Sequence, residues 1–148
     1  MEDAVRIAQD FLDRQGEATM SGDLEATLGW CNIPCTLENS QGHTVARTEA
    51  EMRAICKMFI DTLKAKRLTH MVRHCVEAMF TDKDTICAAY ETRYIKERHQ
   101  LAEDSYAGFV VLRRGDDRWK ISNMQFAGDN DSPVDITLRD WARDRVNA

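Results

Sequence analysis

The chain has 148 residues, of which 43% are hydrophobic and 30% are charged, and its formal net charge is −5 at pH 7. This composition fits one soluble globular domain. It argues against disorder, and the absence of any apolar run near roughly 18 residues excludes a transmembrane helix and with it a membrane partner. The acidic pI of about 5.4 argues against a nucleic-acid partner bound through a basic face.

The N-terminal third of the chain has the pattern of two helices. Apolar residues at three- and four-residue spacings predict an amphipathic helix from about Ala4 to Met20. Gln15 lies inside its apolar stripe, so we expect this amide to face the interior. The pair Ser21-Gly22 ends the helix, and Asp23 is suited to cap a short second helix that carries Trp30.

A hairpin and a third helix should follow. Two short extended runs, 35–38 and 43–47, flank the turn signal at 39–42. Thr48 and Glu51 match a capping box, which predicts the start of a helix that runs to about residue 66. One face of this helix carries the apolar residues Met52, Ile55, Cys56, Phe59, Ile60 and Leu63.

From His70 onward the hydrophobic period changes from about 3.6 residues to about 2, which predicts strands. Helices followed by a meander of strands are typical of an α+β fold with a mainly antiparallel sheet. An acidic linker at 129–133 then leads to an amphipathic, helical C-terminal tail. We therefore divide the chain into a domain at 1–128 and a linker with its tail at 129–148. The four predicted strands are 70–80, 85–97, 106–114 and 119–126.

The order of these elements resembles the nuclear transport factor 2-like superfamily, which includes ketosteroid isomerase and polyketide cyclases. The step Ser-Gly-Asp-Leu at 21–24 and the run Gly-Asp-Asp-Arg-Trp-Lys-Ile at 115–121 carry the resemblance, which covers residues 4–127. It implies a cystatin-like α+β cone, in which a curved sheet wraps around a long helix and leaves a pocket at the wide end. It places the chain in an uncharacterised bacterial branch, and such a fold hosts many activities.

Alternation along the strands predicts which side chains would line that pocket. On the strand at 85–97, Tyr90 should point inward, because charged residues occupy the opposite face. The same reasoning places His74, Asn123 and Gln125 inward on the other strands. Buried amides need hydrogen-bond partners, which a ligand or water in a pocket would provide. The predicted ligand-binding residues are Gln15, Trp30, Asn39, His74, Tyr90, Asn123 and Gln125.

His74 is the best candidate for a catalytic residue, because imidazole titrates near neutral pH and its neighbours on the predicted face are apolar. A structural histidine at the edge of the core explains the same pattern. The resemblance puts the isomerase general base at Asn39, its phenol near Gln15 and its protonated aspartate at Val110. These residue types disfavour ketosteroid isomerisation, unless Glu38 takes the role of the base.

The sequence favours a homodimer that binds a small, mostly apolar organic ligand. We expect a dimer because the outward strand face carries Phe109 and Val111 and needs a cover. Two alternatives are an enzyme of the lyase, isomerase or hydrolase type that uses His74, and a protein-interaction module. No cofactor is expected and no metal, because no Cys or His ligands occur at metal-binding spacing. An acidic N-terminus unlike a secretory signal, with five unpaired cysteines, predicts a cytoplasmic location.

Overall fold

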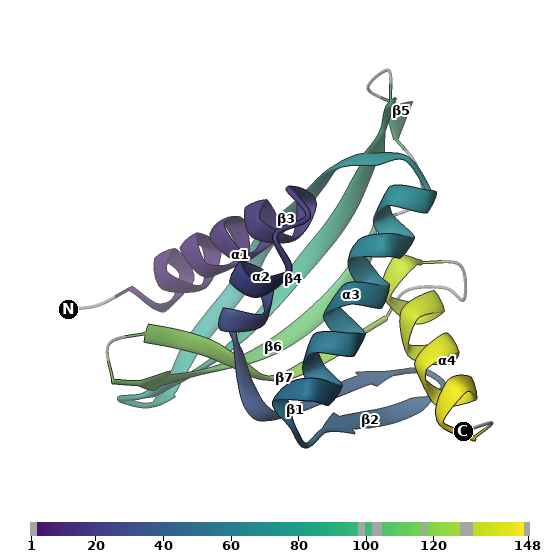
Figure 1. Ribbon diagram of the computed structural model, residues 1–148. Coiled ribbons are helices and arrows are strands. Elements are labelled where there is room, and N and C mark those ends of the chain that lie inside the picture. Colours follow the sequence, from purple (N-terminus) through teal and green to yellow (C-terminus); the bar gives the residue numbers. More distant parts are fainter. Residues whose placement is uncertain (1–2, 98–99, 102–104, 117, 128–131, 147–148) are drawn as a thin grey trace.

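The computed structural model describes residues 3–97, 100–101, 105–116, 118–127 and 132–146 (Figure 1). It confirms the α+β class, the N-terminal helices, the long strands and a C-terminal helix. In chain order the elements are α1 (Ala4–Met20), α2 (Leu24–Gly29), β1 (Cys31–Asn39), β2 (Gly42–Ala46), α3 (Glu49–Ala65), β3 (Leu68–Asp82), β4 (Thr85–Lys96), β5 (Gln100–Leu101), β6 (Tyr106–Gly115), β7 (Arg118–Phe126) and α4 (Pro133–Val146).

The strands form one curved sheet in the order β2-β1-β7-β6-β4-β3, with the short β5 paired to β4. Neighbouring strands are antiparallel, except that β1 runs parallel to β7. The helices lie on one face of the sheet, with α1 along β3 and α4 beside α3 (Figure 1). The core therefore lies between the inner face of the sheet and the helices. None of the described helices is long and apolar enough to cross a membrane.

The helices begin where local capping signals predict. The carboxylate of Asp3 accepts from two backbone N–H groups of α1, and Asp23 accepts from the N–H of Ala26 in α2. The Thr48 hydroxyl accepts from the N–H of Glu51 at the start of α3. Each cap satisfies N–H groups that the first helical turn leaves unpaired. Local chemistry thus accounts for these boundaries.

Strand β1 begins earlier than the sequence pattern predicts, at Cys31 instead of residue 35. The cause is its parallel partner, because Cys31 lies opposite Ile121 of β7 and the Ile121 N–H donates to the carbonyl of Trp30. A partner about 90 positions away in the sequence leaves no local signal at residues 31–34. The first half of β1 is therefore a consequence of tertiary pairing.

The inward faces predicted for β4 and β6 are confirmed. Tyr90, Thr92 and Tyr94 of β4 are at most 2% exposed, and Val110 and Leu112 of β6 are fully buried. The pairing of β4 with β6 contains no register shift, so the side chains of both strands alternate between the two faces of the sheet along the paired length. In strands that pair without a bulge, alternation in the sequence therefore predicts which side chains face inward.

The inward set predicted for the first half of β3 is wrong. His74 is exposed on the outer face, whereas Arg73 and Cys75 are 7% and 3% exposed and face the core. A shift in the β3–β4 register between Cys75 and Glu77 inverts the alternation. Ala78 and Phe80, beyond this bulge, pack against the core as expected. One extra residue in a strand reverses the facing of all residues on one side of it.

The predicted facing of β7 fails for the same reason. A register shift opposite Val111 and Leu112 interrupts the β6–β7 ladder after Ile121, which is 2% exposed and faces inward. Beyond the shift Met124 faces the core, Asn123 pairs with Val111 on the outer face, and Gln125 is exposed. The two amides expected in the pocket therefore point away from it.

Helix α4 is amphipathic, as predicted, and packs against α3 (Figure 1). Val134 and Leu138 are 7% and 6% exposed, Trp141 packs against the core, and Ala142 is exposed. Most of the predicted acidic linker, at 129–131, lies outside the described residues. The tail thus covers an apolar surface of its own chain.

Candidate functional site

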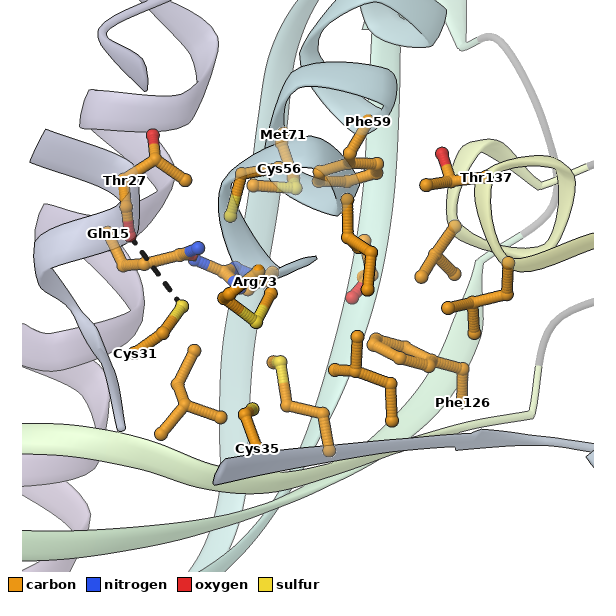
Figure 2. A pocket seen from close by; sticks show the side chains of 18 of the residues that line it. Gln15, Thr27, Cys31, Cys35, Cys56, Phe59, Met71, Arg73, Phe126 and Thr137 are labelled. Atoms are coloured by element: carbon orange, nitrogen blue, oxygen red, sulfur yellow. Dashed lines mark hydrogen bonds between the residues drawn. The ribbon is translucent and has the colours of Figure 1, made fainter. Parts of the chain in front are cut away.

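A cavity of about 70 Å³ lies between the inner face of the sheet, α3 and α4. Its walls are mostly apolar, and every layer of the fold contributes to them. Figure 2 shows Gln15 and Arg73 toward one side of this space, and Phe126 and Thr137 toward the other. The apolar wall includes Leu37, Met52, Ile55, Phe59, Met124 and Leu138.

Arg73 of β3 forms the polar end of the cavity. The residue is 7% exposed, and Nη2 donates to the backbone carbonyl of Leu12, at 2.6 Å, and to Oε1 of Gln15. Because Gly16 has no side chain, the guanidinium can lie close to α1; a Cβ at this position would lie 3.1 Å from Nη2. Burial lowers the pKa of Arg73 from its usual value. Helix α1 thus holds this cation through neutral acceptors.

Three tyrosines border the same end of the cavity. The hydroxyls of Tyr94 and Tyr106 are hydrogen-bonded to each other at 2.8 Å. The Tyr90 hydroxyl is buried and has no hydrogen-bond partner among the described residues. Burial raises the pKa of Tyr90 to about 12, so it is a neutral phenol at physiological pH. Its ring lies against the backbone of Gly108, where a Cβ would come 2.5 Å from Tyr90 Cζ.

The cavity is also lined by three buried, reduced thiols, those of Cys31, Cys35 and Cys56 (Figure 2). Burial raises the pKa of Cys35 to about 12. Cys31 Sγ donates to the Thr27 carbonyl at 3.7 Å (Figure 2). The neighbouring Cys31 thiol and burial raise the pKa of Cys56. Within the described ranges no group of three His, Cys, Asp or Glu side chains is arranged to hold a metal ion. Cys35 and Cys56 therefore contribute soft, neutral surface to the cavity.

The model of a family described as NTF2-like protein (DUF6841) matches residues 2–129. The chain belongs to this NTF2-like family. The resemblance inferred from the sequence is thereby confirmed, and no curated protein matches the chain.

Solved structures similar to this NTF2-like protein support the fold. A domain of unknown function with a cystatin-like fold from Nostoc punctiforme has 16% identity and a TM-score of 0.66, over 95% of this chain and 90% of that one. An NTF2-like protein of unknown function from Shewanella oneidensis has 16% identity and a TM-score of 0.63, over 83% and 98%. A ketosteroid isomerase-like protein from Erwinia carotovora has 12% identity and a TM-score of 0.62, over 86% and 97%. At these identities the likeness concerns the fold alone.

Of the predicted ligand-binding residues, Gln15 and Tyr90 line the cavity of the NTF2-like protein. Trp30 lies outside it, with its ring 5.3 Å from that of Phe11 and 3.6 Å from the Arg118 guanidinium. Asn39 lies beside α4, where its Nδ2 donates to Asp135 Oδ1 at 2.7 Å. Trp30 and Asn39 are therefore placed to support the walls and α4.

His74, Asn123 and Gln125 are not brought to the cavity, because both register shifts turn them outward. The inward position that made His74 a candidate for catalysis is occupied by its neighbour Arg73. Arg73 is not among the residues predicted from the sequence, because a charged residue in an alternating strand normally faces solvent. The only local signal is that Met71, Arg73 and Cys75 also alternate along the strand. The sequence of a regular strand does not show which of its two alternating sets faces inward.

Proposed function

We propose that this NTF2-like protein binds a small, mostly apolar organic ligand in the cavity between the sheet, α3 and α4. The observation that carries the proposal is a cavity with mostly apolar walls and a polar end at Arg73 and Tyr90. Ligand sites of small molecules have this composition, with apolar walls for affinity and a few polar groups for orientation. Helix α4 closes the cavity through Val134, Thr137 and Leu138.

The cavity chemistry favours binding over acid–base catalysis. Among the described residues, no histidine and no carboxylate lines the cavity. General acid–base catalysis works best with a group that titrates near the operating pH. The Tyr90 phenol, with a pKa of about 12, does not meet that requirement. His74 is exposed on the other face of the sheet, so an enzyme that uses it would need a site there.

Filling the cavity should abolish binding. The probe is n-butanol, a small neutral molecule, titrated into the ¹⁵N-labelled protein and followed by amide chemical shifts. Cys35 is 1% exposed and lines the cavity. The variant Cys35→Leu places extra carbon atoms in the ligand space, so we expect n-butanol to bind it at least about tenfold more weakly, a loss of roughly 1.4 kcal/mol.

The matched control is Cys87→Leu. Cys87 is partly exposed on the outer face of β4, away from the cavity lining. This variant should bind n-butanol as the wild type does. Equal binding by the wild type and Cys35→Leu would contradict a ligand site in this cavity.

We also propose that two copies pair through the outer face of the sheet and that the protein is cytoplasmic. Three large apolar residues on β3, Val72, Val76 and Met79, are 48%, 59% and 61% exposed. Phe109 and Val111 of β6 lie on the same outer face of the sheet, on the other side of β4. Exposed apolar surface of this kind favours association, and two-fold dimers are the commonest homo-oligomers. The free thiols support a reducing compartment.

Light scattering should therefore give a mass of about 34 kDa, twice the 17.0 kDa of one chain. A charge at the centre of the interface should be costly to bury, so Val111→Glu should give the mass of a monomer. The control is Val5→Glu, because Val5 is 40% exposed on α1 and lies away from the sheet surface. A wild-type monomer at micromolar concentration would contradict the dimer and favour the alternative of an interaction module.

A further inference from the structure

We propose that the natural ligand of this cavity is a small monocarboxylate, whose carboxylate binds Arg73 and Tyr90 while its apolar part lies against the wall of Met, Ile and Leu side chains. This inference rests on the proposed ligand-binding function and names the chemical class of the ligand. Four observations support this proposal. They are the buried charge of Arg73, the unpartnered hydroxyl of Tyr90 among the described residues, the position of both on one face of the sheet, and the charge and size that the cavity accepts.

The first observation is that Arg73 is a buried cation to which no carboxylate of the described residues is hydrogen-bonded, although Asp13 acts on its charge from farther away. Arginine stays protonated inside proteins, and Arg73 is 7% exposed. Its hydrogen-bond acceptors are the Leu12 carbonyl and the Gln15 amide oxygen, both neutral, and its Nε has no acceptor within the described part of the chain. The described residues place no carboxylate in an ion pair with it. A buried charge is normally paired, so this guanidinium lacks an anion.

The second observation is the Tyr90 hydroxyl, a buried donor without a partner in the described residues. Buried hydroxyls almost always find an acceptor. Because residue 108 is a glycine, the Tyr90 ring can lie close to the backbone of β6, and the sheet itself sets the position of the phenol. The phenol remains protonated at physiological pH and can donate to an anion.

The third observation is that both donors lie on the same face of paired strands. Arg73 lies opposite Thr92, and Tyr90 lies opposite Cys75, so the two residues occupy diagonal positions of the β3–β4 ladder. Long side chains at diagonal positions reach one another. Both line the same cavity. One carboxylate can accept from a guanidinium and a phenol together, since it has two oxygens and about four lone-pair sites.

The fourth observation concerns charge and size. A single guanidinium balances one negative charge, which favours a monoanion over a phosphate dianion. A cavity of about 70 Å³ with walls of Leu37, Met52 and Ile55 favours a short alkyl group. A planar carboxylate is also the group that the guanidinium fork binds best. A short-chain monocarboxylate satisfies the cation, the phenol and the apolar wall together.

The test compares three probes of nearly equal shape, namely sodium butyrate, butyramide and n-butanol, by NMR titration of the full chain in chloride-free buffer. We expect butyrate to bind at least about tenfold more tightly than butyramide, because a charge-assisted hydrogen bond is roughly twice as strong as a neutral one. Arg73→Met should weaken butyrate binding about tenfold or more and leave n-butanol binding nearly unchanged. Arg118→Met, outside the cavity beside Trp30, should change neither.

A second variant tests the proposal even if Arg73→Met does not fold. Tyr90→Phe removes only the unpartnered hydroxyl, so the variant should fold and should bind butyrate several-fold more weakly than the wild type. Equal affinities for butyrate and butyramide, or a wild-type butyrate affinity in both variants, would overturn the carboxylate. If n-butanol still binds and Cys35→Leu blocks it, the ligand-binding function stands without the carboxylate. If none of the three probes binds, the proposed function itself fails.

Discussion

The variant Gly108→Ala should lower the free energy of unfolding by about 1–3 kcal/mol, the usual cost of overpacking a core. An alanine Cβ at position 108 would lie 2.5 Å from Cζ and 2.7 Å from the hydroxyl of Tyr90, closer than side-chain carbons approach in proteins. Both residues belong to the interior of paired strands β4 and β6. Neither backbone can move without disturbing the ladder, so the ring of Tyr90 must leave its position.

Urea denaturation of the variant and of two controls tests this explanation. Gly115→Ala should stay within about 0.5 kcal/mol of the wild type, because a Cβ at Gly115 meets no atom within 4 Å. If the clash is with Tyr90, the substitution Tyr90→Leu should reduce the cost of Gly108→Ala, which a double-mutant cycle measures. An unchanged cost in the Tyr90→Leu background would show that the strain lies elsewhere.

The double variant Arg73→Met, Gln15→Leu should raise the free energy of unfolding of the ligand-free protein by about 1–4 kcal/mol. Arg73 is buried with neutral acceptors only, so folding without ligand removes its charge from water and pairs it with no anion in the described residues. Replacing buried ionic groups by apolar residues of similar volume is often stabilising. Removing Gln15 in the same variant avoids leaving its amide oxygen without a donor.

Thermal and urea unfolding of the ligand-free variant measure the effect. The control Arg14→Met removes an arginine whose side chain is 65% exposed and pairs with Asp10 on the surface of α1, so it should change stability by less than about 1 kcal/mol. A marked loss of stability in the double variant would show that Arg73 is a structural residue. A gain in stability together with loss of butyrate binding would show that the protein keeps Arg73 for its ligand, at a cost to its own stability.

The sequence alone determined the features that depend on local chemistry. Asp23 and Thr48 cap their helices where the sequence predicts. The inward face of β4 follows from simple alternation, because its charged residues Glu91 and Arg93 cannot be buried cheaply. The apolar stripe of α1 predicts that Gln15 faces inward and the alternation of β4 predicts the same for Tyr90, and both residues line the cavity. These inferences hold because each one needs only residues within a few positions along the chain.

The tertiary structure alone decided the composition of the cavity. The bulges after Cys75 and opposite Val111 arise from the register between strands, which alternation within one strand does not contain. They turn His74 and Asn123 outward and bring Arg73 to the position that a regular strand would give its neighbour. The parallel pairing of β1 with β7, and the packing of α4 against α3, likewise join segments far apart in the sequence. A one-residue shift between strands exchanged a histidine for an arginine at the site, because side chains in a strand alternate between its two faces.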